Sequence, residues 1–260
     1  MAPRRRLDVE LVRRGLASSR TEAQSFVDDH RVIVNGATAE RSSRQVAADD
    51  RVSVTGPAPR FVGRGGLKLD HALDVFGVEV RDAVVLDAGA STGGFTDCLL
   101  QRGAARVVAV DVGRGQLHER LRTDPRVVNL ERTNVRSIDI ELLGGRVDAV
   151  VGDLSFISLG LVIDRLVAVC KPGGWMVLLV KPQFEAGREE VSRGRGVITD
   201  PVVQDRVRVE VGDALTTSGC AVLGWTDSPI TGADGNREFL VHVRTPTAAV
   251  PSQSDGSGTP

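Results

Sequence analysis

The residues that decide the fold are Val84-Val85-Leu86-Asp87-Ala88-Gly89-Ala90-Ser91-Thr92-Gly93-Gly94-Phe95. Residues 84–88 form a run of β-branched and aliphatic side chains that contains one acid, which is typical of a buried parallel strand. Small residues follow, and Ser91 and Thr92 are predicted to cap a helix whose apolar face begins at Phe95. A strand, a glycine-rich turn and a helix N-terminus let a nucleotide-like ligand approach backbone N–H groups closely. The stretch therefore predicts an open α/β sheet that binds an adenosine-containing cofactor at the carboxyl ends of its strands.

The pattern around this turn separates two classes of cofactor. Dinucleotide sites follow G-x-G-x-x-G, which leaves room for a pyrophosphate over the helix N-terminus. Here the pattern is Asp-x-Gly-x-x-x-Gly-Gly, and a carboxylate beside the first glycine would repel a pyrophosphate but accept hydrogen bonds from the cationic amino-acid part of S-adenosylmethionine. A second predicted strand ends in Asp111, 22 residues after Gly89, where a doubly wound fold places the carboxylate that holds ribose hydroxyls. The sequence favours S-adenosylmethionine over a nicotinamide dinucleotide. The predicted cofactor-binding residues are Asp87, Gly89, Ser91, Gly93, Gly94, Asp111, Asn134 and Asp153.

Length and composition exclude several classes of protein. A chain of 260 residues can hold one full domain and a small one. No apolar run approaches the ~20 residues that a membrane helix needs, so no membrane association and a cytoplasmic location are expected. Cys98, Cys170 and Cys220 are widely spaced and fit neither a disulfide framework nor a zinc site, so no metal is expected. The net charge is −1, but residues 1–60 carry 11 Arg and no Lys against 8 acids, a local net charge of +3.

Strands and helices alternate after residue 66, which is the pattern of a parallel sheet. A helix containing Lys68 is expected between Gly66 and Gly77, before the first strand. The predicted strands cover residues 84–88, 106–111, 127–131, 147–152, 174–180, 220–226 and 238–244, and the predicted helices cover residues 94–102, 115–122, 158–170 and 200–218. Only a loop joins the last two strands, which predicts an antiparallel hairpin at one edge. The fold class is therefore α/β, with a seven-strand Rossmann-like domain.

The first 55 residues have a pattern of their own. They predict a helix over residues 7–14, a second helix capped by Ser19 and Glu22, and short strands over residues 32–34 and 51–54. Arginines on such a small α+β unit make a surface for phosphate contacts, although the charge alone favours a solvated basic face on a small interaction domain.

The order of motifs in this segment resembles the αL RNA-binding module of small-ribosomal-subunit protein four and of pseudouridine synthases. The resemblance is carried by Arg6-Leu7-Asp8, Leu16-Ala17-Ser18-Ser19-Arg20-Thr21-Glu22-Ala23, Val32-x-Val34-Asn35-Gly36 and Asp50-x-Val52, and it covers residues 6–54. It implies contact with structured RNA. The predicted RNA-binding residues are Arg4, Arg5, Arg6, Arg13, Arg14, Arg20, Arg31 and Arg64.

Charged residues stand where predicted strands begin or end. Asp153 and Lys181 follow two strands and Glu238 opens the last one, while Lys68 precedes the sheet. Each alone fits a surface charge or a helix cap, but two lysines and two carboxylates at one pocket suit methylation of a ribose 2′-hydroxyl. That hydroxyl is a poor nucleophile, and a lysine can serve as its base when burial and a neighbouring cation lower the lysine pKa. Methylation of a ring nitrogen stays an alternative, because Asp153-Leu154-Ser155-Phe156 loosely resembles the Asp-Pro-Pro-Tyr signature of amino-methyltransferases without its two prolines.

Four motifs together resemble the TlyA family, bacterial proteins that join an αL domain to a class I methyltransferase domain of the FtsJ/RrmJ type. They are Asp87-Ala-Gly-Ala-Ser-Thr-Gly-Gly-Phe-Thr, Val110-Asp111-Val-Gly-x-Gly-Gln-Leu, Asp153-Leu-Ser-Phe-Ile-Ser and Lys181-Pro-Gln-Phe-Glu, within a match over residues 4–244. The resemblance implies 2′-O-methylation of cytidines in ribosomal RNA by a Lys-Asp-Lys-Glu tetrad. Carried over by motif, the tetrad is Lys68, Asp153, Lys181 and Glu238. Lys181 is then the base, Asp153 and Glu238 position it, and Lys68 supports the hydroxyl or a neighbouring phosphate.

The resemblance also carries expectations about substrate and organisation. Arg4-Arg5-Arg6 resembles the longer members, which modify small- and large-subunit RNA and confer susceptibility to capreomycin-type antibiotics. Gly63 stands where many members have Ser. Phe156 could support an extruded base, or be part of the core. The expected organisation is an RNA-binding domain over residues 1–56, a linker over 57–66, a methyltransferase domain over 67–245 and a disordered tail over 246–260, with a monomer favoured.

Two further functions compete with this interpretation. Family members also carry the name haemolysin, but a pore-forming protein needs membrane-spanning or strongly amphipathic segments, and the sequence offers none. A non-catalytic RNA-binding assembly factor that keeps the cofactor fold as a scaffold has no physical need for lysines at both Lys68 and Lys181.

Overall fold

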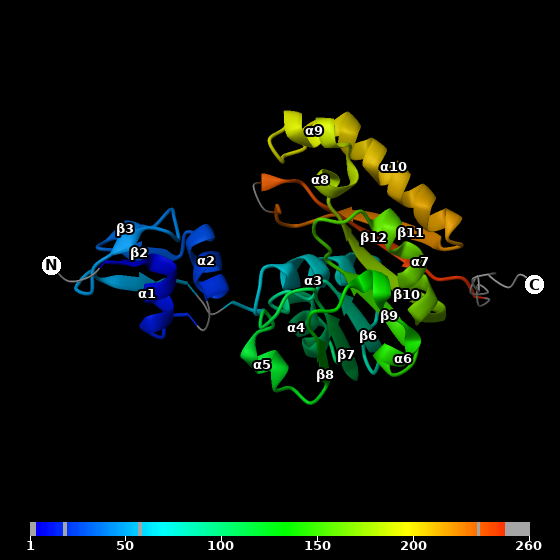
Figure 1. Cartoon of the computed structure of the whole chain (residues 1–260), viewed down its shortest axis with the longest axis horizontal. Helices are drawn as coiled ribbons and strands as arrows, with labels where there is room; N and C mark the ends of the chain where they lie inside the picture. Colours follow the sequence, from blue (N-terminus) through cyan, green and yellow to red (C-terminus); the bar gives the residue numbers. More distant parts are fainter. Residues whose placement is uncertain (1–3, 18–19, 57–58, 233–234, 248–260) are drawn as a thin grey trace, which may run out of the picture. The chain divides into compact units, whose positions relative to one another are not determined.

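The computed structural model describes residues 4–17, 20–56, 59–232 and 235–247. The predicted cap at Ser19 and most of the predicted tail lie outside these residues. Contacts divide the chain into two compact units, Met1–Arg64 and Gly65–Pro260. Each unit is described by itself below (Figure 1).

The small unit packs two helices against short antiparallel strands. Its elements are β1 (Arg5–Arg6), α1 (Leu7–Arg13), α2 (Arg20–Asp28), β2 (Val32–Val34), β3 (Ala37–Thr38), β4 (Gln45–Val46) and β5 (Val52–Val54). Strand β2 pairs with β3 and β5, and β1 pairs with β4. Leu11, Phe26 and Val32 belong to the buried core that holds these elements together. Both predicted helices and both predicted strands are confirmed, and the three strands that the sequence analysis missed are only two residues long.

The large unit is built on a sheet of seven strands. Its first half contains α3 (Gly65–Phe76), β6 (Val84–Ala88), α4 (Gly94–Gln101), β7 (Arg106–Val110), α5 (Glu119–Arg122), β8 (Val127–Leu130), η1 (Val135–Ser137), α6 (Ile140–Leu143) and β9 (Val147–Gly152). Its second half contains η2 (Leu159–Leu161), α7 (Ile163–Val169), β10 (Cys170–Val180), α8 (Pro182–Glu185), α9 (Arg188–Arg193), α10 (Pro201–Thr217), β11 (Ala221–Asp227) and β12 (Phe239–Arg244). The predicted α/β class is confirmed.

The strand order in this sheet is β11-β12-β10-β9-β6-β7-β8. Strands β6 to β10 are parallel to their neighbours within this group, whereas β12 is antiparallel to both β10 and β11. The predicted antiparallel hairpin is confirmed, and β12 lies between β10 and β11 so that β11 forms the edge. The carboxyl ends of β6, β7, β9 and β10 therefore meet at one side of the sheet.

Helices lie on both faces of the sheet (Figure 1). Leu86, Val150 and Leu178 share one face, and the buried side chains of α7 and α10 join them in one core. The alternate residues on β6 and β7, Val85 and Val107, are buried on the opposite face. Because both faces are covered, these strands are apolar throughout, which is why the sequence shows them as continuous runs.

Three predicted helix boundaries are wrong for local physical reasons. Helix α5 begins at Glu119 rather than residue 115, because Gly115 has a φ of +64° and a helix requires negative φ. Helix α4 is capped by Gly93 with no side-chain hydrogen bond, so the predicted Ser91–Thr92 cap is wrong. The predicted helix over 158–170 is divided into η2 and α7, and residue 170 already belongs to β10.

No helix among the described residues is long and apolar enough to cross a bilayer. Within the same residues, no group of three or more His, Cys, Asp or Glu side chains is arranged to hold a metal ion.

Candidate active site

A cavity of about 1050 Å³ opens where β6, β7, β9 and β10 end. Five of the predicted cofactor-binding residues line it together: Gly89, Ser91, Asp111, Asn134 and Asp153. The cavity extends along the sheet from β7 to β10, which is three strands away. Asp111 follows β7, and the residues Gln183 and Phe184 follow β10. The cavity therefore has one end at the predicted ribose carboxylate and the other beside the predicted base, Lys181.

Gly89 lets the turn after β6 pass directly against the end of β9. Its φ is +86°, and a Cβ at this position would lie 2.8 Å from the carbonyl oxygen of Asp153. Any side chain here would push the two strand ends apart and move Asp153, so glycine is required.

Asp111 is held in place by two backbone donors. The N–H of Ser91 donates to Oδ2 at 2.8 Å, and the N–H of Gly113 donates to Oδ1 at 2.7 Å. A carboxylate has about four lone-pair sites, so acceptor capacity for two ribose hydroxyls remains. Gln116, which sequence reasoning missed, also lines this end of the cavity, and the nearby Asn134 accepts a hydrogen bond from the N–H of Arg136 while capping η1.

Asp87 is fully buried and does not line the cavity. Its Oδ2 accepts a 2.6 Å hydrogen bond from the Thr96 hydroxyl, while its buried Oδ1 has no hydrogen-bond partner among the described residues. Burial raises the pKa of this carboxyl to about 7, the hydrogen bond from Thr96 opposes that shift, and the nearby charge of Asp153 adds to it. The unpartnered oxygen is an acceptor for a donor that the described protein groups do not supply.

Gly93 and Gly94 also lie outside the cavity lining. Gly93 has a φ of +96°, and a Cβ there would lie 2.2 Å from Cδ1 of Leu121. The glycine is therefore needed for the packing of α4 against α5, not for an open approach to a ligand.

The four predicted tetrad residues form two ion pairs. Nζ of Lys68 lies 2.5 Å from Oε2 of Glu238, and Nζ of Lys181 lies 2.5 Å from Oδ1 of Asp153. Both lysines are only 8% exposed. Burying an ammonium is costly unless it is paired, so each lysine depends on its carboxylate.

The backbone brings these two pairs side by side. Val180 pairs with Phe239 across β10 and β12. Lys181 comes directly after Val180, and Glu238 comes directly before Phe239, so the two are neighbours at this end of the sheet. The first turn of α3 lies against Asp153, because a Cβ on Gly65 would lie 3.6 Å from Asp153 Oδ2, and Lys68 is three residues further along that helix.

The segment that follows Asp153 carries residues that sequence reasoning did not assign. The Ser155 hydroxyl lies 2.8 Å from Lys181 Nζ, which donates to it. Phe156 has a φ of +64° and is 91% exposed, so it is not a core residue. Its ring centroid lies 5.2 Å from that of Phe184, and Lys181 Nζ lies 5.7 Å from the Phe184 ring. No spacing rule predicts these contacts, because they depend on how two loops meet.

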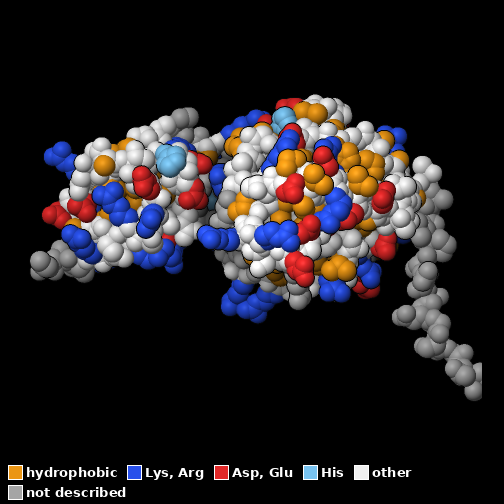
Figure 2. Space-filling model, turned by 90° about the horizontal axis from the view of Figure 1, so that it is seen from above, with side chains coloured by type: hydrophobic (Ala, Val, Ile, Leu, Met, Phe, Trp, Pro, Cys, Tyr) orange, Lys and Arg blue, Asp and Glu red, His pale blue; other side chains and the backbone are white. Residues whose placement is uncertain are grey.

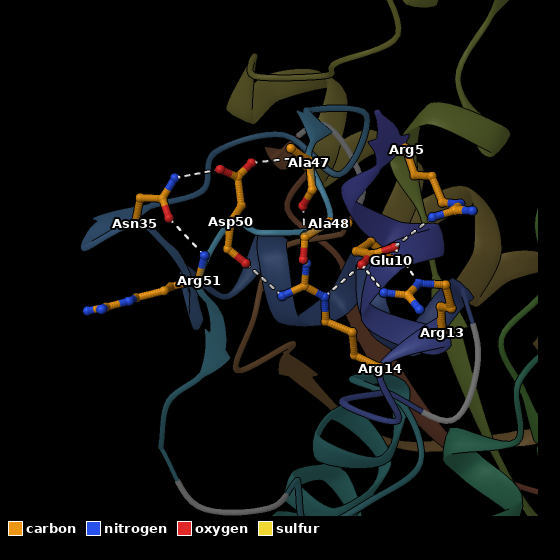
Figure 3. Close-up of polar contacts among 9 residues, drawn as sticks. All are labelled: Arg5, Glu10, Arg13, Arg14, Asn35, Ala47, Ala48, Asp50 and Arg51. Carbon is orange, nitrogen blue, oxygen red and sulfur yellow. Dashed lines mark hydrogen bonds and ion pairs between the residues drawn. The ribbon is translucent and has the colours of Figure 1, made fainter. Parts of the chain in front are cut away.

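Arginines and acids are interspersed over the small unit (Figure 2). Two buried carboxylates on α1 organise several of the predicted RNA-binding arginines. Glu10 accepts from Arg13 at 2.6 Å and from Arg14 at 2.7 Å, with Arg5 at 4.0 Å (Figure 3). The Arg13 guanidinium holds the pKa of Glu10 down at about 2.

Asp8 is the second of these carboxylates. It pairs with Arg6 at 2.9 Å and Arg20 at 3.0 Å, and the hydrogen bond from Arg6 holds its pKa well below the usual range.

The predicted RNA-binding arginines differ in how much of the side chain faces solvent. Arg14 donates to the carbonyl oxygens of Ala47, Ala48 and Asp50 as well as to Glu10, and its side chain is 19% exposed (Figure 3). Its neighbour Arg13 is 50% exposed. The guanidinium of Arg14 is therefore committed to the fold of the unit.

Three further arginines were predicted to bind RNA. Arg31 donates to the carbonyl of Thr55 and lies over the Phe26 ring. Arg4 is exposed, and Arg64 is the last residue of the small unit.

Comparison with protein families matches both units. Residues 61–245 match the FtsJ-like methyltransferase family, and residues 5–52 match the S4 domain. The chain is similar to the 16S/23S rRNA (cytidine-2′-O)-methyltransferase TlyA of Mycobacterium tuberculosis, with 47% identity over 95% of this chain and 92% of that protein. It is also 38% identical to hemolysin A of Brachyspira hyodysenteriae, over 91% of this chain and 98% of that protein.

A solved structure matches nearly the whole chain. A protein of Streptococcus thermophilus whose structure carries a hemolysin name superimposes with a TM-score of 0.75 and 39% identity, covering 97% of this chain and 93% of that one.

Proposed function

The chain belongs to the TlyA family of FtsJ-like methyltransferases, and we propose that it methylates the ribose 2′-hydroxyl of cytidines in ribosomal RNA. The observation that carries this proposal is the two buried lysine–carboxylate pairs beside the cavity. A methyltransferase that modifies a ring nitrogen has no need of a buried lysine as base, whereas a ribose hydroxyl must lose its proton as it attacks.

The residues at the β6–β7 end of the cavity fit S-adenosylmethionine. Asp111 has acceptor capacity for ribose hydroxyls, and Gly89 leaves a turn without a side chain. When bound, this cofactor supplies an electrophilic methyl group on a sulfonium. Asn134 and Asp153 complete the wall on either side.

Lys181 is proposed to take the proton of the attacking 2′-hydroxyl on Nζ. The methyl group for this oxygen would come from S-adenosylmethionine held by Asp111 and the turn at Gly89. The hydrogen bond to Ser155 at 2.8 Å fixes the direction of Nζ, and Asp153 Oδ1 lies 2.5 Å from Nζ as its ion-pair partner. Lys68, held by Glu238, supplies a second cation that stabilises an oxyanion at the acceptor.

Phe156 and the small unit are proposed to hold the RNA. An exposed ring at the mouth of the cavity offers a stacking surface for an extruded base, which a 2′-hydroxyl inside a helix requires. The S4 domain supplies arginine contacts to RNA phosphates. The relative from Mycobacterium tuberculosis is named for both 16S and 23S RNA, so both subunits are proposed as substrates. The capreomycin response stays a prediction.

The test is to incubate the protein with methyl-labelled S-adenosylmethionine and separated ribosomal subunits, and then to map linkages that resist alkali. Resistance at a cytidine is expected, because a methylated 2′-oxygen cannot attack its own phosphate. Label without alkali resistance would mean base methylation and would overturn the proposal. Absence of label on either subunit would leave the S4 domain and a scaffold role as the better account.

A further inference from the structure

Two segments that follow neighbouring strands run alongside each other at the acceptor end of the cavity. Residues 153–159 follow β9, and residues 181–185 follow β10. The contacts between Asp153, Ser155 and Lys181 and the ring contact between Phe156 and Phe184 have been described above. A further contact is made by Glu185, which the proposed mechanism does not use.

Both carboxylate oxygens of Glu185 accept hydrogen bonds from the segment of residues 153–159. The Ser158 hydroxyl donates to Oε2 at 2.6 Å, and the N–H of Leu159 donates to Oε1 at 2.9 Å. Among the described residues no Lys or Arg side chain forms an ion pair with it. Burial raises the pKa of this carboxyl, against the effect of both hydrogen bonds. A carboxylate kept away from water without a cation is expensive for stability, so its benefit must lie in the geometry that it fixes.

The geometry that Glu185 helps to fix is the backbone conformation of Phe156. A bulky residue at a φ of +64° is strained, and such conformations persist only when the surroundings enforce them. Leaving the ring in water also forgoes the free energy gained by burying its apolar surface. Both terms favour collapse of the segment onto the apolar cavity wall, where Leu154 and Ile157 offer contacts. The segment is anchored on each side of Phe156, by Ser155 on Lys181 and by Ser158 on Glu185.

We propose that Glu185 is a positioning residue that keeps Phe156 extended and Ser155 on Lys181, so that the acceptor nucleotide meets a prepared site. The proposal rests on the proposed function, because it assumes that Phe156 and Lys181 serve the acceptor. Glu185 itself touches no reacting atom. Its removal weakens the acceptor end of the cavity and leaves the Asp111 end unchanged.

The first experiment compares the kinetics of Glu185→Ala with those of the wild type on ribosomal subunits. The expected result is a fall in kcat/KM for RNA of about tenfold or more, equivalent to ~1.4 kcal/mol, while the Kd for S-adenosylmethionine measured by calorimetry stays the same. Glu185→Gln should recover most of the loss, because its carbonyl still accepts from Leu159 and the Ser158 hydroxyl can turn to accept from its amide. Glu189→Ala, which removes an exposed carboxylate on α9, is the matched control and should behave as wild type.

The second experiment measures the position of the ring itself. Phe156→Trp places a fluorescent side chain at the exposed position, and adding Glu185→Ala to it should shift the emission to shorter wavelength as the ring becomes buried. Subtraction of spectra without the reporter removes the signal of Trp175 and Trp225. A merely structural role would lower the unfolding temperature and the cofactor affinity together, and would not be rescued by Gln.

The proposal is overturned if Glu185→Ala has wild-type kinetics, if only its cofactor affinity falls, or if the reporter spectrum does not move. If Glu185→Ala does not fold, Ser158→Ala removes one of the two bonds and should give a smaller change in the same direction; no change would overturn the proposal. Failure of the proposed function is seen separately, because wild-type protein would then produce no alkali-resistant cytidine whatever the reporter shows.

Discussion

The small unit buries two carboxylates against arginines, whereas the four tetrad residues of the large unit pair carboxylates with lysines. Asp8 and Glu10 hold arginines whose side chains, apart from Arg14, remain about half exposed. Asp153 and Glu238 hold lysines that are themselves buried. The acids play a similar part in both places, and the cation differs.

The difference follows from the chemistry of the two cations. A guanidinium keeps its proton in proteins and presents a rigid fork of donors, which suits the recognition of phosphate oxygens. An ammonium is a compact charge whose proton can be lost when it is desolvated, which suits acid–base chemistry. The difference supports the proposal that the small unit binds RNA and that the large unit moves a proton.

The contrast between arginine and lysine is tested most directly at Lys181. Lys181→Arg keeps the positive charge beside Asp153 but provides no group that can take up a proton, so the methylation rate should fall about 10²–10⁴-fold. Initial rates with labelled S-adenosylmethionine measure the effect. Lys171→Arg, at an exposed lysine that also pairs with an aspartate, is the matched control and should keep the wild-type rate. A rate near wild type in Lys181→Arg would remove this lysine from the role of base.

Asp87, another buried carboxylate of the large unit, forms no ion pair with any cation among the described residues, and its dependence on pH sharpens the contrast. Its pKa is raised to about 7, so between pH 4 and 7 the folded state binds more protons than the unfolded state, and stability falls as pH rises. Asp87→Asn should therefore be more stable than wild type by ~2–4 kcal/mol at pH 8, with the gap closing toward pH 4.

Urea unfolding followed by tryptophan fluorescence measures this gap in the large unit, because both tryptophans, Trp175 and Trp225, belong to it. Asp213→Asn, at an exposed acid on α10, should show no such dependence. A constant difference between Asp87→Asn and wild type across this pH range would mean that Asp87 stays ionised.

Arg13 and Arg14 test the comparison within the small unit, because both pair with Glu10 but differ in exposure. Arg13→Ala should weaken binding to ribosomal RNA by about 1–2 kcal/mol, roughly 5–30-fold in Kd, and reduce the salt dependence by one phosphate contact. Arg14→Ala should leave the salt dependence unchanged and instead speed hydrogen exchange in residues 7–54, because three backbone carbonyls lose their donor. The reverse pattern would show that exposure does not identify the arginines that contact RNA.

The smallest expected effect is that of the acid that holds the arginines. Asp8→Asn adds one positive charge to the small unit, and charge alone would predict tighter binding to RNA. If Asp8 orients Arg6 and Arg20, binding should instead weaken by about 0.5–1 kcal/mol, roughly two- to fivefold, because two long side chains regain rotamer freedom. Filter binding at several salt concentrations decides the sign. Tighter binding would mean that these arginines need no anchor.

The sequence predicted the strands of the large unit, because buried parallel strands leave continuous apolar runs, and the four tetrad residues came from a family resemblance. Both carboxylates were expected to position Lys181, whereas Glu238 pairs with Lys68. The sequence did not predict that Asp87 lies behind the turn rather than in the cavity. The direction of a side chain at a strand end depends on the next helix, here on Thr96 of α4. It also did not separate Arg13 from Arg14, because neighbouring arginines on a short helix differ only in what the rest of the fold offers them. Ser155 and Glu185 were missed because their contacts join loops 26 residues or more apart.

The position of β12 has a consequence for the order in which the chain folds during its synthesis. This strand is inserted between β10 and β11, and Glu238, the partner of Lys68, stands directly before it. Domains fold progressively as the chain leaves the ribosome, so the other six strands are available before the seventh has been translated. The second lysine–carboxylate pair is therefore completed only after Glu238 has been translated. A nascent chain can fold its S4 domain and six strands of its sheet earlier, but it gains the partner of Lys68 only after residues 238–244 have emerged.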